Sequence, residues 1–103
     1  MSDRVLGLLG LGLRGGLVIV GVEAVRAALQ RGDLACIVMA ADASPRAVEK
    51  IGRLARARGV PSVPAGAAAA LGARLGRPPV MVAGVRDPKL AAGLVAAGQP
   101  VKQ

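Results

Sequence analysis

Residues 14–25 of the chain read RGGLVIVGVEAV, and this stretch decides the fold that the sequence predicts. Residues 17–20 form a short apolar run rich in β-branched side chains, which is typical of a buried strand. Gly21 ends this run, and apolar residues then recur at spacings of three and four over residues 22–29, which predicts a helix that Gly32 closes. A buried strand followed at once by a helix indicates an α/β unit.

The same alternation continues on both sides of this unit. We expect a first helix from Ser2 or Asp3 to about Arg14, ended by two glycines. Because proline lacks a backbone donor, residues 61–64 are expected to form only a short edge strand. The pattern predicts one α/β domain over residues 1–103, with a mostly parallel or mixed sheet and helices on both faces. The other expected strands lie at residues 35–40 and 80–85, and the other expected helices run from the Ser44-Pro45 pair to about Arg58, over residues 67–75, and from Asp87-Pro88 to about Ala97.

The composition favours a folded protein with an anionic partner. Hydrophobic residues make up 53% of the 103 residues and charged residues 19%, so the chain can bury a core. Lys and Arg number 14 against 6 acidic residues, and the resulting charge of +8 favours a polyanion such as nucleic acid. The alternative is that these cations only keep an apolar chain in solution. Because Phe, Tyr and Trp are absent from the sequence, aromatic platforms for stacked bases are excluded.

The residue types that most catalytic sites need are scarce. The sequence has no His and one Cys, which excludes the common zinc sites, the Ser-His-Asp triad and the Cys-His pair. Cys36 lies in an apolar run and is expected to act as a small buried hydrophobe. We therefore predict a protein that is not an enzyme and that needs no cofactor and no metal.

The apolar residues 5–13 resemble the start of a signal peptide or a membrane span. Arg14 interrupts them after nine residues, whereas a span needs about 20 apolar residues. No small-residue cleavage site follows. We expect no signal peptide, no membrane span and a cytoplasmic location.

A glycine pattern over residues 10–15, GLGLRG, matches the dinucleotide-binding signature G-x-G-x-x-G. That site requires a helix directly after the glycines, so that amide groups meet the pyrophosphate. Here Gly16 and a predicted strand follow instead. Close packing of a helix is the main interpretation of these glycines, and a nucleotide-binding domain is kept as an alternative.

The turn at Gly21 is a second candidate site. The helix predicted after it begins with unpaired amide groups, which favour an anion such as phosphate. Arg14, Arg26 and Arg31 lie close in sequence on either side, and Glu23 falls in the first turn of the helix. This arrangement predicts a basic face near helix ends.

Several segments, in their order and spacing, carry a resemblance to a known family. They are residues 14–25 followed by Arg31-Gly32, residues 37–44 (IVMAADAS), residues 58–61 (RGVP), residues 71–79 (LGARLGRPP) and residues 80–88 (VMVAGVRDP). From about Val5 to Leu94 the chain resembles the kink-turn RNA-binding ribosomal proteins, the L-seven-Ae, L-thirty-e and S-twelve-e family, nearest its bacterial YlxQ-type branch. The resemblance implies a three-layer α/β/α sandwich with a mixed sheet of about four strands.

The resemblance also implies a function, the non-catalytic binding of structured RNA such as a kink-turn or ribosomal RNA. Further partners would be proteins of the ribosome, of translation or of transcription. The family holds a sharply bent RNA through sheared purine pairs and backbone shape, without aromatic platforms. RNA contacts are expected at residues 21–27 and at residues 76–79. With the neighbouring arginines, the expected RNA-binding residues are Arg14, Gly16, Leu17, Gly21, Val22, Glu23, Ala24, Arg26, Ala27, Arg31, Arg77 and Pro78.

The chain departs from the family at residues that read bases. Typical members carry an Asn-Glu pair and a Lys where this sequence has Glu23, Ala24 and Ala27. Alanine cannot hydrogen-bond a guanine edge, so affinity would come from arginine contacts to phosphates. Leu17 stands where Lys is frequent, and Arg77-Pro78 replaces an apolar loop tip. These departures keep open a protein-interaction or assembly module of the same fold that has lost RNA recognition.

Overall fold

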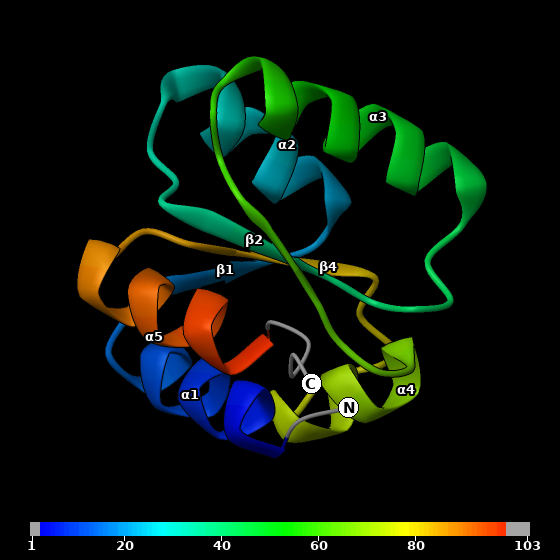
Figure 1. Ribbon diagram of the computed structural model, residues 1–103. Helices are drawn as coiled ribbons and strands as arrows, with labels where there is room; N and C mark the ends of the chain where they lie inside the picture. The colour runs from blue at the N-terminus through cyan, green and yellow to red at the C-terminus, as the bar shows by residue number, and fades with distance from the viewer. Residues whose placement is uncertain (1–2, 99–103) are drawn as a thin grey trace, which may run out of the picture.

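Short apolar runs form the strands and amphipathic segments form the helices, as the sequence predicts. A computed structural model describes residues 3–98, so Ser2, one of the two expected caps of the first helix, lies outside the described residues. Figure 1 follows the elements in chain order. They are α1 (Asp3–Arg14), β1 (Val18–Val20), α2 (Val22–Arg31), β2 (Cys36–Met39), α3 (Pro45–Ala57), β3 (Ser62–Pro64), α4 (Ala68–Arg74), β4 (Val82–Val85) and α5 (Pro88–Gly98).

The four strands form one mixed sheet in the order β1-β4-β2-β3. Strand β4 pairs antiparallel with β1 and with β2, whereas β3 pairs parallel with β2. Helices α2 and α3 cover one face, and α1, α4 and α5 cover the other (Figure 1). This arrangement confirms the α/β class and the three-layer α/β/α sandwich. The proline-flanked β3 lies at an edge of the sheet, as predicted.

Strand β4 begins later than the sequence pattern suggests. The apolar run starts at Val80, but the strand starts at Val82. The backbone N–H of Val80 donates to the carbonyl oxygen of Ala68 at the start of α4, at 3.0 Å, and not to a neighbouring strand. Residues 80 and 81 therefore connect α4 to the sheet.

Side chains of the central strands alternate between two cores. Ile37 and Val82 point toward α2 and α3, whereas Cys36, Val38 and Ala83 point toward α1, α4 and α5. All of these residues are fully buried. Burial raises the pKa of the Cys36 thiol to about 11, so this side chain behaves as a hydrophobe at neutral pH. No helix within residues 3–98 is long and apolar enough to cross a membrane.

Replacing Val38 by alanine should lower the free energy of unfolding by about 2 kcal/mol, because a fully buried strand residue would leave a cavity. Chemical denaturation followed by circular dichroism measures this change. Val48→Ala is the matched control, because Val48 on α3 is 45% exposed and its truncation should change stability by no more than about 0.5 kcal/mol. Equal midpoints for the two variants would contradict the placement of Val38 in the core.

Candidate functional site

The junction between β1 and α2 leaves a helix N-terminus open. Gly21 has φ 107°, a conformation that side-chain-bearing residues rarely adopt, and its N–H donates to the carbonyl oxygen of Val82 at 3.0 Å. Because Gly21 has no side chain, no side-chain hydrogen bond caps α2. The amide groups in the first turn of this ten-residue helix are thus available to an anion.

A hollow of about 310 Å³ lies beside this junction. It is formed by two segments that are far apart in the sequence, the end of β1 with the start of α2 and the connection that leads into β4. Its walls are mostly apolar, and exposed Arg77 and Pro78 line it from the second segment. The lining residues are Val20, Gly21, Val22, Arg77, Pro78, Pro79, Val80 and Met81.

The loop of Arg77 and Pro78 is held against α4 through Gly72. The N–H of Arg77 donates to the carbonyl oxygen of Gly72 at 2.8 Å. A Cβ atom added at Gly72 would lie 2.7 Å from the carbonyl carbon of Pro78 and would overlap its oxygen. Only glycine at this position lets the loop backbone pack so closely on the helix.

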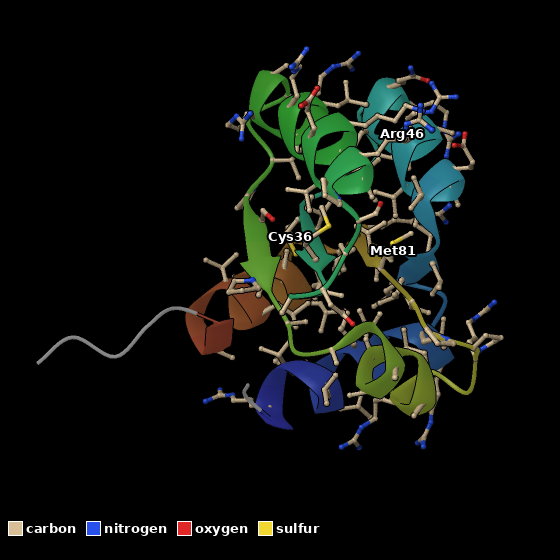
Figure 2. All side chains as sticks on the ribbon, turned by 90° about the vertical axis from the view of Figure 1, so that its right-hand side faces the viewer. Cys36, Arg46 and Met81 are labelled. Carbon is tan, nitrogen blue, oxygen red and sulfur yellow. The ribbon has the colours of Figure 1, made fainter. Side chains whose placement is uncertain are left out.

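Met81 joins the hollow to the start of α3. Its carbonyl oxygen accepts from the N–H of Ala40 at 2.8 Å, and its Sδ accepts from the N–H of Ser44 at 3.4 Å. The Oγ of Ser44 in turn caps α3 by accepting from the N–H of Ala47 at 3.2 Å. Figure 2 looks onto this end of the molecule, with Met81 labelled below α2. The starts of α2 and α3 therefore lie at the same end of the sheet, on either side of Met81.

Of the residues expected to bind RNA, four line the hollow: Gly21, Val22, Arg77 and Pro78. Four more lie on the following turns of α2, on its exposed or half-buried side: Glu23, Ala24, Arg26 and Ala27. Within this group Arg26 Nη2 pairs with Glu23 Oε1 at 3.2 Å. The side chains of this pair are 38% and 72% exposed, so the pair stabilises the fold little.

Three expected residues lie at the other end of the sheet. Gly16 and Leu17 precede β1, about 17 Å and 13 Å of extended chain from Gly21. Arg31 is the last residue of α2 and pairs with Asp33 through Nε and Oδ2 at 2.9 Å. Arg14 lines a separate hollow between α1 and α4. The structure thus does not bring these four residues to the hollow at Gly21.

Sequence reasoning missed Gly72 and Met81 as parts of this site. Pro79, which also lines the hollow, lies within residues 76–79, where RNA contacts were expected. The role of Gly72 depends on a contact between two backbones, and that of Met81 on contacts with Ala40 and Ser44. No local signal marks either of them.

The glycines of residues 10–15 lie within and just after α1, not ahead of a helix. A Cβ at Gly12 would collide with the side chains of Leu90 and Val18, so this glycine serves helix packing. This geometry lacks the open helix start that a dinucleotide site requires. Within the described part of the chain, no group of three or more His, Cys, Asp or Glu side chains is placed to hold a metal ion.

Comparisons with known proteins agree with this architecture. The model of the Ribosomal protein L7Ae/L30e/S12e/Gadd45 family matches residues 3–95. A solved structure of a protein with unknown function from Bacillus halodurans is 28% identical, with a TM-score of 0.87 over 91% of this chain and 95% of that chain. The 15.5kD RNA binding protein of Giardia lamblia is 25% identical, with a TM-score of 0.81 over 92% of this chain and 84% of that chain. A comparison with curated protein sequences finds no match.

Replacing Gly72 by alanine should destabilise the protein by roughly 1–3 kcal/mol and shift the amide NMR signals of Gly76 and Arg77, because the added methyl group collides with the loop backbone. Gly52→Ala is the control, since a Cβ at Gly52 in α3 meets only Arg56 Nη1, at 3.9 Å. The control should raise stability by roughly 0.5–1 kcal/mol through helix propensity. A Gly72 variant that behaves like the control would refute the close contact.

Proposed function

The chain belongs to the ribosomal protein L7Ae/L30e/S12e/Gadd45 family, and from this premise we propose that it binds structured RNA without catalysing a reaction. The observation that carries the proposal is the hollow in which the open start of α2 meets the Arg77-Pro78 loop. The proposed ligand is a folded RNA of the cytoplasm, with a kink-turn or ribosomal RNA as the leading class. Proteins of the ribosome, translation or transcription are its proposed neighbours.

Three features of the hollow suit a bent RNA. The uncapped amide groups at the start of α2 can donate hydrogen bonds to a phosphate, and the exposed guanidinium group of Arg77 can neutralise a second one. Val20, Val22 and Pro78 give an apolar wall against which an unstacked base or ribose can lie. Recognition of this kind depends on RNA shape and does not need aromatic side chains.

The residues on α2 suit recognition of RNA shape more than recognition of individual bases. Ala24 and Ala27 offer no hydrogen bond to a base, and Glu23 repels phosphate unless it meets a base amino group. Arg26 contacts Glu23 only through an exposed ion pair, so a phosphate can compete for its guanidinium group. We therefore propose broad affinity for bent RNA with modest discrimination of the kink-turn purine pairs.

Replacing Arg77 by glutamine should weaken binding of a fluorescein-labelled kink-turn RNA by about five- to tenfold at low salt, because one phosphate contact is lost. Fluorescence anisotropy of the RNA gives the dissociation constant. Arg86→Gln is the control, because Arg86 is also exposed but follows β4, whereas Arg77 precedes it. Double substitution of Arg26 and Arg77 by glutamate should abolish binding.

Absence of binding by the wild-type protein to kink-turn and other structured RNAs at low salt would overturn the proposed function. If the Arg77→Gln and Arg86→Gln variants bound the RNA with equal affinity, the hollow would not be the binding site. Protein partners that are recovered after nuclease treatment would then favour the protein-interaction module, which the alanines at positions 24 and 27 also suit.

Installing the typical family residues should create base discrimination. The triple variant Glu23→Asn, Ala24→Glu, Ala27→Lys should prefer a kink-turn RNA over the same RNA with Watson–Crick pairs in place of its sheared pairs by at least about tenfold, since each bidentate base contact is worth about 1–3 kcal/mol. The wild-type protein should bind the two RNAs within a few fold of each other. A strong preference in the wild type would show that base reading survives without these side chains.

A further inference from the structure

A second hollow, of about 570 Å³, runs between α1 and α4. Arg14 enters it from α1 and Arg74 from α4, so two guanidinium groups line one concavity. Both residues are exposed. The lining residues are Gly7, Gly10, Leu11, Leu13, Arg14, Arg74, Leu75 and Gly76, and we refer to this surface as the α1–α4 groove.

The α1 side of the groove is deep because Gly7 and Gly10 have no side chains there. A Cβ at Gly7 would meet nothing within 4 Å, and a Cβ at Gly10 would lie 3.8 Å from Cδ of Arg74. The Arg74 side chain therefore crosses over Gly10, while the helix backbone at Gly7 is accessible. A chain as bulky as a sugar-phosphate backbone can approach the helix closely at this point.

No described acidic side chain lines the groove, and each of them is engaged elsewhere. Glu23, Asp33 and Glu49 pair with arginines on or beside their own helices, as exposed ion pairs. Asp42 accepts from the N–H of Ala68 at 2.7 Å, and Asp87 accepts from the N–H of Leu90 at 2.8 Å. The charge of the groove is thus positive without local compensation by these groups, which is the complement of a polyanion.

The α1–α4 groove adjoins the hollow at Gly21 through one loop. Gly76 lines the groove and Arg77, the next residue, lines the hollow. An anionic chain that passes Arg77 can therefore continue over Gly76 toward Arg74. The two hollows are lined by three arginines that can contact one continuous phosphate backbone: Arg77, Arg74 and Arg14.

We propose that the α1–α4 groove binds the phosphate backbone of an RNA stem that extends from the bent segment held at Gly21, with Arg14 and Arg74 as the phosphate-contacting residues. This inference rests on the proposed function and adds a second RNA contact to it. That contact is with the phosphate backbone and distinguishes neither the base sequence nor the bend. The groove lengthens the footprint on RNA and gives affinity that depends on stem length and on salt.

The test compares three labelled RNAs. One is a kink-turn with short stems, and the other two are versions of it in which one or the other stem is lengthened by a helical turn. Wild-type protein should bind one of the lengthened RNAs more tightly than the short RNA. The variant Arg14→Gln/Arg74→Gln should lose this gain in affinity, which is about tenfold. The slope of the logarithm of its association constant against the logarithm of salt concentration should become less steep by about two units. The control Arg86→Gln/Lys89→Gln removes two exposed cations, one just after β4 and one in the first turn of α5. It should keep the gain in affinity and the salt slope.

A second measurement does not depend on the stability of these variants. Leu11 lines the groove and is 64% exposed, whereas Cys36 is fully buried, so a thiol-reactive photocrosslinker on the Leu11→Cys protein attaches at position 11. Crosslinks should map to the lengthened stem. Crosslinks only to the bent segment would overturn the groove contact. So would an Arg14→Gln/Arg74→Gln variant that binds like its control, while RNA binding that depends on Arg77 would stand. Loss of all RNA binding by the wild-type protein would instead overturn the proposed function.

Discussion

The antiparallel pairing of β4 with β1 is the constraint on which the candidate site depends. Val18 lies opposite Val85 and Val20 lies opposite Ala83, so the end of β1 meets the beginning of β4. This register brings the loop before β4 to the start of α2, although more than fifty residues separate them in the sequence. A parallel arrangement of the same two strands would place Arg77 and Gly21 at opposite ends of the sheet. The antiparallel direction of the two strands therefore brings together the two segments that form the hollow.

The sequence predicts the elements of this fold well because each of them carries a local signal. Ser44 caps α3 as its Ser-Pro start indicates, and the prolines that flank Val63 keep β3 at an edge. The order of the strands carries no such signal, since apolar runs report burial and not the identity of a neighbour. The pattern left a mostly parallel or a mixed sheet open, and the family resemblance favoured the mixed one. The resemblance also supplied the two segments that meet at the hollow.

The candidate site was predictable only in part, because closeness in sequence differs from closeness in space. Arg26 and Arg31 are five residues apart, but Arg31 ends α2 about 13 Å along the helix axis from Val22 and there pairs with Asp33. Arg14 lies shortly before β1 in the sequence. As the last residue of α1, however, it faces α4 and not the hollow at Gly21. In contrast, Gly72 acts on Arg77 through a backbone contact that no pattern of residue types reveals. Charge clusters in the sequence therefore predicted the sign of the surface better than its location.

The absence of aromatic residues links the core to the way in which the protein can hold RNA. An aliphatic core reaches native density by close packing of small residues: a Cβ at Gly84 would lie 2.7 Å from Cδ1 of Leu34 and 3.2 Å from Cγ1 of Ile19. On α2, the small residues Ala24 and Ala27 offer no side-chain hydrogen bond to a base. Under the proposed function, recognition therefore rests mainly on backbone geometry, open amide groups and arginine. These groups respond to the path of a phosphate chain, so an RNA that is already bent loses less conformational entropy on binding than one that must bend. The proposed selectivity would then follow from the shape of the RNA more than from its sequence.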